Sequence, residues 1–350
     1  MIPEEGAKEM SLRNLQNFFL IKLVIIFSLA GTVRAYAADE SDGANTSAAA
    51  PETKAKTQDV NPQANAVPGS EVVDDLLTNN NLRALSGSKS RWSVASQFDY
   101  LGGTVNEPLS QDRPDISGAS GNTLKSDLDG AISAKYNLNP TNAILAGIGL
   151  RWIAPLAGSQ LTNYNGTTFD VMNPYVQYQH IYKWAGIQSV LQVTDMQWTQ
   201  ADYTILGYAN QINVDQENMY EIGKSKLTVG ASTQLQYQFF NQSGAVNTPT
   251  GFIPDVSAYQ SVYLFTIAPV IEYQLSSKVN LRTLVNAWTY EHYGNQAGPF
   301  SFVHDAIYQS VGVGISVTRD IFLYPNLQFL PGQLEADLTN VGITATINLF

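Results

Sequence analysis

The sequence predicts an all-β fold: a transmembrane, antiparallel, up-and-down β-barrel of about twelve strands that follows a disordered N-terminal segment. Three observations lead to this prediction. An apolar export signal stands near the start, polar and apolar residues alternate through most of residues 91–350, and aromatic residues gather near the ends of the alternating segments. Alternation with period two indicates strands whose two faces meet different surroundings. A chain of 350 residues is long enough for one large barrel domain.

The composition suits such a barrel and excludes several functions. Charged residues make up 14%, and the mean hydropathy is -0.11, as expected when lipid-facing residues alternate with wet ones. Thirty acidic residues against nineteen basic ones give a net charge of -11, and no basic stripe occurs, so we expect no nucleic acid partner. The chain has no Cys, which excludes disulfides, thiolate metal sites, Cys nucleophiles and lipidation on an N-terminal cysteine.

Residues 1–37 read as a signal peptide. Lys8 and Arg13 precede a mostly apolar stretch from Phe18 to Gly31, and small residues stand at Ala35 and Ala37. This is the arrangement that signal peptidase recognises, so we expect cleavage after Ala37. A membrane anchor is the alternative, but the uninterrupted apolar run is much shorter than the ~20 residues that span a bilayer.

Two further segments precede the predicted barrel. Residues 38–70 are rich in Ala, Pro, Ser and Thr and have too few large apolar side chains to offset the entropy of ordering, so we expect a disordered linker. In residues 71–90, Val72, Val73, Leu76 and Leu77 recur at helical spacing before three consecutive Asn weaken the pattern. We expect a short helical or irregular pre-barrel segment here, and a plug inside the lumen is the alternative.

Eleven segments within residues 91–350 alternate clearly. In the cleanest, Leu227 to Phe239, one face carries Leu, Val, Ala, Thr, Tyr and Phe and the other mostly Gln, Ser and Thr. The other ten are Trp92 to Leu101, Leu128 to Leu138, Ile144 to Trp152, Met172 to Tyr182, Ile187 to Trp198, Tyr263 to Leu275, Val279 to Tyr290, Ile307 to Val317, Ile321 to Phe329 and Val341 to Phe350.

The twelfth strand is inferred from parity. Single-chain barrels of this kind normally have an even number of strands, with short turns on the periplasmic side and longer loops outside. Four tight connections, at 137–142, 183–186, 276–278 and 318–320, share one side only if one more strand lies between Thr199 and Lys226. We assign that strand to Asp202 to Gln211, which leaves both ends of the barrel domain on the periplasmic side.

Two hairpins allow predictions of register. Pairing Leu275 with Val279 brings Glu272 opposite Arg282 on the inner face, which predicts a charge pair in the lumen. Pairing Val317 with Ile321 puts Gly314 opposite Tyr324, an arrangement in which an aromatic ring covers a glycine in a curved strand.

Aromatic residues collect near the strand ends, where amphipathic rings favour the headgroup level of a bilayer. We expect Trp92, Tyr136, Tyr182, Trp184 and Tyr273 in the periplasmic belt and Tyr100, Trp152, Trp198, Tyr263 and Tyr290 in the outer belt.

With its export signal, alternating strands, aromatic belts and terminal Phe350, the chain resembles the Gram-negative outer-membrane β-barrel class over Arg91 to Phe350. This resemblance implies an outer-membrane location with many membrane passes and a periplasmic N-terminal tail. It also implies contact with outer-membrane lipid and with the barrel-assembly machinery, but no active site. Phe350 departs from the pattern, because the apolar face of the last strand runs through Val341, Ile343, Ala345, Ile347 and Leu349.

Catalytic and metal-binding patterns are weak. His304 with Asp305, assisted by Ser301 or Ser310, is the best hydrolase candidate, but adjacent strand residues point to opposite faces. His292 and His304 have no carboxylate spacing that would complete a metal site. We therefore expect no enzyme activity, no metal and no cofactor.

The inner wall is the better functional candidate. We expect it to be rich in neutral amides with few charges, and its lining residues are Lys135, Arg151, Gln177, Gln179, Gln234, Gln236, Gln238, Glu272, Arg282 and Asn286. Such a wall suits a narrow channel for small polar solutes. One alternative is a structural or surface-interaction barrel that uses long outer loops at 102–126 and 154–170, and another is a lipid hydrolase. The sequence leaves the solute, the oligomeric state and an open lumen undecided.

Overall fold

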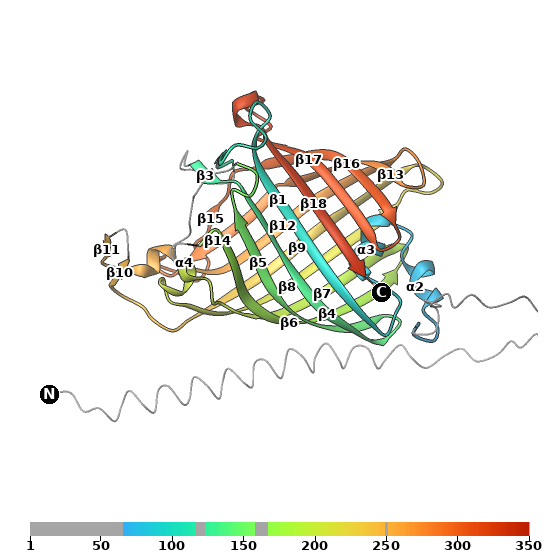
Figure 1. The fold of residues 1–350 in the computed structure, drawn as a ribbon, viewed down its shortest axis with the longest axis horizontal. Coiled ribbons are helices and arrows are strands. Elements are labelled where there is room, and N and C mark those ends of the chain that lie inside the picture. The colour runs from blue at the N-terminus through green and yellow to red at the C-terminus, as the bar shows by residue number, and fades with distance from the viewer. Residues whose placement is uncertain (1–65, 117–122, 158–166, 249–250, 350) are drawn as a thin grey trace, which may run out of the picture. The chain divides into compact units, whose positions relative to one another are not determined.

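The computed structural model describes residues 66–116, 123–157, 167–248 and 251–349. Its main feature is a closed antiparallel barrel of twelve strands (Figure 1). The strands are β1 (Trp92–Thr104), β4 (Asp127–Asn139), β5 (Asn142–Ile153), β6 (Phe169–Trp184), β7 (Ile187–Gln197), β8 (Tyr208–Glu221), β9 (Leu227–Phe240), β12 (Ser261–Gln274), β13 (Val279–Asn286) with its continuation β14 (Trp288–Tyr293), β16 (Tyr308–Thr318), β17 (Ile321–Phe329) and β18 (Asn340–Leu349).

The barrel closes where its first and last strands meet. β1 pairs with β4 on one side and with β18 on the other, from Val94 opposite Leu349 to Thr104 opposite Asn340. Closure pairs the backbone groups that an open sheet would leave at its edges. A barrel can therefore cross a bilayer without exposing unpaired backbone N–H and C=O groups to hydrocarbon.

The two ends of the barrel differ. Short turns join the strands at one end, which we call the short-turn end, and all four predicted tight connections lie there. The turn between β6 and β7 consists of Ala185 and Gly186, both with positive φ (50° and 84°), as two-residue hairpin turns require. The opposite, long-loop end carries β2 (Asp112–Pro114), β3 (Thr123–Lys125), α4 (Ala201–Thr204), β10 (Val246–Thr248), β11 (Gly251–Ile253), η2 (Val256–Tyr259), β15 (Val303–His304) and η3 (Ala336–Leu338).

The eleven strands predicted from alternation are confirmed, but the position of the twelfth is wrong. Asp202 lies in the helical turn α4, and β8 begins only at Tyr208 and ends at Glu221. The alternation of β8 is limited to Gln211 to Asp215, because Gln216 and Asn218 put polar side chains on its outward face as well. The predicted strand Val279 to Tyr290 is also interrupted at Ala287, where the pairing with β12 shifts by one residue.

The register predictions have mixed outcomes. Glu272 does lie opposite Arg282, which confirms the first hairpin. In the second, the flanking pairs place Gly314 opposite Tyr324, but a bulge near Val317 pairs Thr318 with Ile321. The predicted pairing of Gly314 with Tyr324 is thus confirmed, and the ring atom nearest to an added Gly314 Cβ is Phe322 Cζ, at 2.7 Å.

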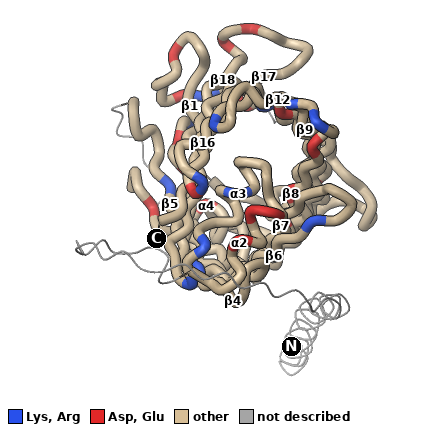
Figure 2. The backbone as a smooth tube through the Cα atoms, turned by 90° about the vertical axis from the view of Figure 1, so that its right-hand side faces the viewer, with Lys and Arg blue, Asp and Glu red and all other residues tan. Residues whose placement is uncertain are grey.

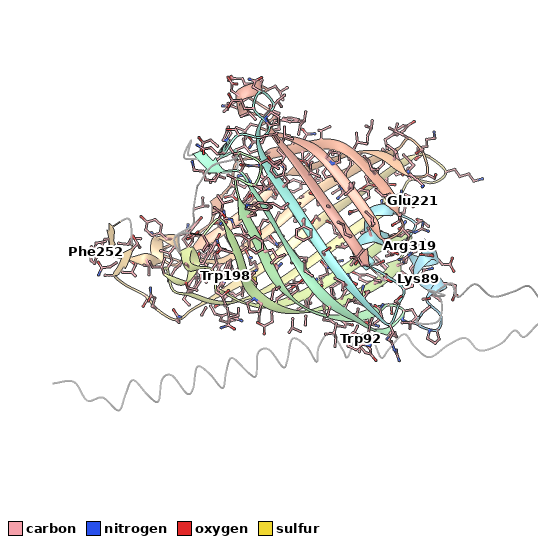
Figure 3. The ribbon with its side chains drawn as sticks, in the orientation of Figure 1. Lys89, Trp92, Trp198, Glu221, Phe252 and Arg319 are labelled. Atoms are coloured by element: carbon pink, nitrogen blue, oxygen red, sulfur yellow. The ribbon has the colours of Figure 1, made fainter. Side chains whose placement is uncertain are left out.

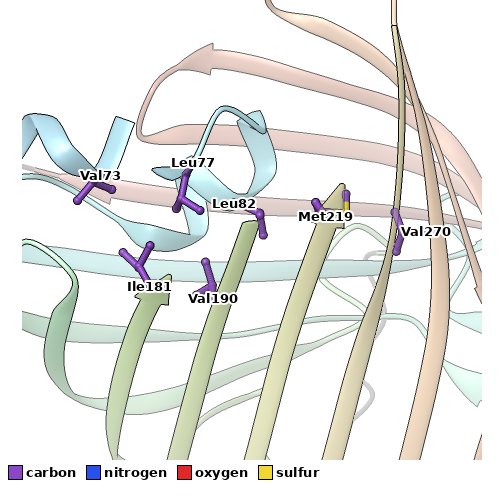
Figure 4. Packing of buried hydrophobic residues seen from close by; sticks show 7 residues of the cluster. All are labelled: Val73, Leu77, Leu82, Ile181, Val190, Met219 and Val270. Atoms are coloured by element: carbon purple, nitrogen blue, oxygen red, sulfur yellow. The ribbon is translucent and has the colours of Figure 1, made fainter. Parts of the chain in front are cut away.

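Residues 71–87, which we call the plug, lie at the short-turn end of the barrel. They form α2 (Glu71–Leu76) and α3 (Asn80–Ser86). Figure 2 looks onto this end and shows both helices in front of or within the ring of strands, and Figure 1 shows α3 among the strand ends and α2 just beyond them. Leu77 and Leu82 are fully buried against wall residues Ile181, Val190, Met219 and Val270 (Figure 4). Residues 71–87 are helical, as expected of a pre-barrel segment, and their contacts with the inner wall are those of the alternative, a plug. None of the helices in the described part of the chain is long and apolar enough to cross a membrane.

Wall side chains satisfy the backbone groups at the ends of the plug helices. The last carbonyl groups of α3 accept hydrogen bonds from the wall: Ala84 from Asn348 (2.7 Å), Leu85 from Gln179 (2.9 Å) and Ser86 from Lys135. Between the helices, the N–H groups of Thr78 and Asn79 donate to Gln188 Oε1 at 2.8 and 2.9 Å. Buried helix termini need such partners, so these hydrogen bonds from the wall stabilise the plug in its position.

Candidate functional site in the barrel lumen

The two faces of the wall have opposite chemistry. Outward positions expose large apolar side chains, among them Ile132, Ile144, Leu235, Ile271, Leu281, Val311, Leu327 and Ile343. Trp92 and Trp184 are the most exposed aromatic residues at the short-turn end, with 64% and 72% of their surface accessible; Figure 3 shows Trp92 there. A closed barrel with an apolar exterior, interfacial aromatic residues and a polar interior defines an outer-membrane β-barrel protein.

One aromatic residue departs from the predicted belts. Trp198, expected in the outer belt, turns inward, where its Nε1 donates to Gln238 Oε1 at 2.8 Å. Its ring stacks on Tyr203 of α4 with the ring centroids 4.2 Å apart. The prediction for Trp198 is wrong because α4 folds inward and offers both a stacking partner and a hydrogen bond to the wall.

A cavity of about 630 Å³ lies inside the barrel. Its lining extends from Leu85 of the plug to Tyr203 of α4 and includes inward-facing residues of β1, β4, β5, β6 and β7. The polar part of the lining includes hydroxyl groups, and most of its members are carboxylates and amides: Gln97, Asp99, Asp129, Asn173, Gln177, Gln192, Gln200, Gln211, Gln236 and Asn348. The cavity is therefore large enough for a small solute and can hydrogen-bond it.

The predicted glutamines have different surroundings. Gln177 and Gln236 line the cavity. Gln234 and Gln238 face inward but are engaged by neighbours, since Gln234 Nε2 donates to Asp215 at 3.0 Å and Gln238 Nε2 donates to Gln211 at 2.8 Å. Gln179 is buried beneath the plug and accepts from Lys135 Nζ at 2.7 Å, so these two residues hold the plug.

The remaining predicted residues lie in polar clusters of the wall. Glu272 and Arg282 form a buried ion pair, and Glu272 Oε2 also accepts from Asn79 of the plug (2.7 Å) and from Asn280 (3.1 Å). Arg151 pairs with Asp127 at 3.0 Å and approaches Asp202 of α4 at 4.0 Å. Asn286 accepts from Thr289 Oγ1 at 3.0 Å.

Acidic residues of the inner wall were missed by the sequence reasoning, and the expectation of few charges there is wrong. Asp99 and Asp129 lie directly opposite each other in the β1–β4 ladder, and both line the cavity. Two like charges in that position repel. Among the described residues that line the cavity, none is Lys or Arg, so the cavity is an electronegative compartment. Both strands had been predicted, so their alternation was the signal that could have revealed these two residues.

Two more acids, Asp215 and Glu217, face inward from β8, opposite Gln234 and Ser232 of β9. They could not be found from the sequence, because the strand that carries them was placed too early. With Asp99 and Asp129 they make the described interior more acidic than the ten predicted residues suggested.

Long loops narrow the lumen at the other end. Arg113 of β2 is buried, and its guanidinium donates to Gln328 Oε1 at 2.6 Å and to the carbonyl oxygen of Gly102 at 3.3 Å. Burial lowers the pKa of Arg113, partly opposed by the charge of Asp127. Asn340 in turn donates to the Pro114 carbonyl oxygen at 2.9 Å. The loop between β1 and β4 therefore folds onto the inner wall.

The hydrolase candidate is not assembled. His304 is exposed, and its Nε2 lies 3.2 Å from the carbonyl oxygen of Ala287. The hydroxyl of Ser310 lies instead beside Tyr324 at 3.2 Å, and Ser301 is contacted through its carbonyl oxygen by His292. Within the described ranges, no three His, Asp or Glu side chains gather in a way that could hold a metal ion.

No protein family and no curated protein matches the sequence. Solved structures with related architecture include the NanC porin, which shares 9% identity over 74% of this chain and 98% of that chain, with a TM-score of 0.36. The KdgM porin in complex with disordered oligogalacturonate shares 7% over 74% and 98%, with a TM-score of 0.37. An outer membrane channel from Pseudomonas putida F1 shares 7% over 75% and 97%, with a TM-score of 0.42. At these values they assign no solute and no role to this chain.

Proposed function

We propose that this protein is a narrow channel for small polar solutes in the bacterial outer membrane. The observation that carries the proposal is the cavity of about 630 Å³ with a polar lining, enclosed by a wall whose outer surface is apolar. The interior of a barrel widens with the number of strands. Twelve strands lie between the filled barrels of ~8 strands and the open pores of roughly 16 to 18, so we expect a narrow path.

The proposed orientation follows from the loops. Short turns normally face the periplasm and long loops the outside, so the plug lies at the periplasmic mouth. An export signal cleaved after Ala37, a linker at 38–70 and a periplasmic N-terminal tail fit this orientation. Outer-membrane lipid contacts the apolar face, and the barrel-assembly machinery inserts the chain. The out-of-phase residue Phe350 lies outside the described residues.

The plug limits conduction in this conformation. It fills part of the short-turn end and is held by both apolar contacts and hydrogen bonds to the wall. We infer that solutes pass when the plug shifts or loosens, and that the wall itself stays closed.

Two measurements test the proposal. Purified protein in planar bilayers should give small, reproducible conductance steps, and liposomes that contain it should swell in small polar solutes but not in large ones. Deletion of residues 71–87, or the double variant L77A/L82A, should enlarge the steps. The proposal is wrong if all three proteins, the wild type and both plug variants, fold as barrels but none of them conducts ions or admits any solute.

A further inference from the structure

The lipid-facing wall carries a cluster of polar side chains on β5 to β8, near the short-turn end. Its members are Asn142, Tyr178, His180, Tyr182, Ser189, Gln216 and Asn218, and we call it the polar patch. Each faces outward, because its strand neighbours Ala143, Gln177, Gln179, Gln188 and Glu217 turn inward. On β7 and β8 it is flanked by Ile187 and Tyr220 toward the short-turn end and by Val193 and Val214 toward the other end.

A network of contacts joins the members of the patch. Asn218 Oδ1 accepts from Ser189 Oγ and from Gln216 Nε2, both at 2.8 Å, and Gln216 Nε2 also donates to the Tyr182 hydroxyl at 2.7 Å. The Tyr182 ring stacks on His180 with the ring centroids 5.4 Å apart. His180 Nδ1 lies 2.8 Å from Asn142 Oδ1, which also accepts from Tyr178. The patch is therefore one continuous surface.

The patch is confined to one side, which distinguishes it from an interfacial belt. A belt runs around a whole barrel at headgroup level. At a similar distance from the short-turn end, the opposite strands present Leu323, Ala345, Ile347 and Val94, all apolar. Other polar residues face outward singly or in pairs. Ser96, Thr233 and Thr283 each donate to a backbone carbonyl oxygen of a neighbouring strand, and Gln309 donates to the Thr283 hydroxyl.

The hydrogen bonds of the patch leave complementary groups unused. Within the described part of the chain, Asn218 Nδ2 has no acceptor and Gln216 Oε1 has no donor at hydrogen-bond distance. Facing hydrocarbon, such groups are costly, because lipid tails offer no partner. A two-fold axis through the patch would let Asn218 of each copy donate to Gln216 of the other, so the surface is self-complementary.

We propose that the polar patch is the interface of a two-fold dimer of this chain within the membrane. The proposal rests on the membrane location under the proposed function. A single self-complementary patch produces a closed dimer, whereas a ring of three or more copies needs two different patches on each copy. Aromatic and amide side chains grouped at the centre, with apolar residues around them, are also typical of a protein interface.

The absence of cysteine allows a direct test. Ala231, which faces outward opposite Asn218, is changed to Cys, and membranes that contain the A231C variant are treated with a short bismaleimide. The matched control is A345C, an outward alanine on β18, which is five strands from β9 around the wall. The dimer predicts a cross-linked band for A231C at least tenfold stronger than for A345C. Equal bands, or none, would overturn the proposal.

A second experiment measures the patch itself. The double variant Q216L/N218L in the A231C background should lower cross-linking at least tenfold, and native mass spectrometry in detergent should shift from dimer to monomer. T283V, which removes an outward polar group elsewhere, should leave both unchanged. Bound lipid in place of a second copy, seen as monomer with lipid adducts, contradicts the dimer. A wild-type protein that is monomeric but conducts removes this inference alone, whereas a dimeric wild type without conductance removes the channel alone.

Discussion

The side-chain amide of Asn79 donates to Glu272 at 2.7 Å, and Glu272 is at the same time the ion-pair partner of Arg282 in the barrel wall. The cap residue of α3, which also accepts from the Leu82 N–H at 3.1 Å, is thus tied to the most deeply buried charge pair among the described residues. Plug and wall are stabilised through one shared carboxylate.

Glu272→Gln should destabilise the barrel. The amide keeps the shape of the side chain but leaves Arg282 buried without its counter-charge, which typically costs about 3–5 kcal/mol. Denaturant unfolding in lipid vesicles, followed by tryptophan fluorescence, should show a lower midpoint. Glu107→Gln, at an exposed loop position, is the control. An unchanged midpoint for Glu272→Gln would contradict a stabilising role for the pair.

Loosening the apolar contacts of the plug should free it without unfolding the wall. Leu82 is fully buried, so Leu82→Ala should cost about 2–5 kcal/mol of plug packing. Hydrogen exchange of residues 71–87 should then become at least tenfold faster, while the barrel strands keep their protection. Val72→Ala is the matched control, because Val72 lies on the same segment and is 47% exposed. Plug amides that exchange at the wild-type rate in Leu82→Ala would show that the plug is not held by these contacts.

The plug should also respond to acid. Burial raises the pKa of Asp74, but hydrogen bonds and charges from Lys89 and Arg319 outweigh burial, so that the pKa is lowered from its usual value of 3.8. Figure 3 shows both basic residues at the short-turn end. For a lowered carboxyl pKa, the stabilisation is complete above the usual value and is lost as the pH falls through the lowered one.

Protection of the plug amides against hydrogen exchange, corrected for the intrinsic pH dependence, should therefore stay constant from pH 7 to about 5 and fall only below pH 4, the region of the usual Asp pKa. Asp74→Asn should show the lowered protection at every pH, because it lacks the charge that pairs with Lys89 and Arg319. Wild-type protection that falls already between pH 7 and pH 5 would point to a different titrating group.

The acidic cavity should make the channel select for cations. Asp99 and Asp129 face each other across the β1–β4 ladder, and none of the described lining residues is basic. In a KCl gradient the reversal potential of the wild type should favour K⁺, and D99N/D129N should move it toward zero. Glu335→Gln, on an exposed loop, should not. A wild type that prefers Cl⁻ would contradict an electronegative path.

Alternation alone predicted most of the barrel because lipid and water impose opposite demands on neighbouring residues. Leu227 to Phe239 obeys this rule, and β9 covers almost the same residues. β8 escaped detection because Gln216 and Asn218 place polar groups on the outward face, where the rule expects apolar ones. The same two residues therefore explain why β8 was not predicted and form part of the proposed dimer interface.

The plug and the inward loops depend on tertiary contacts that no local pattern contains. Asn79 and Asn80 weakened the helical pattern, yet Asn79 is the cap of α3 and reaches Glu272. Lys135 and Gln179 lie on inward positions of their strands, and their contacts with the plug depend on Ser86 and Leu85, which are more than 40 residues away in sequence. Arg113 likewise gains its partner Gln328 only once the barrel has closed.

The barrel wall separates water inside from lipid outside, and two adjacent residues of β1 give the sharpest test of this separation. Gln97 lines the cavity, whereas Phe98 faces outward. In the cysteine-free chain, Q97C should react in membranes with a small, charged, water-soluble thiol reagent at least a hundredfold faster than F98C, and F98C should react with a lipid-soluble maleimide. Equal rates at the two positions, or faster reaction of F98C with the charged reagent, would contradict the account.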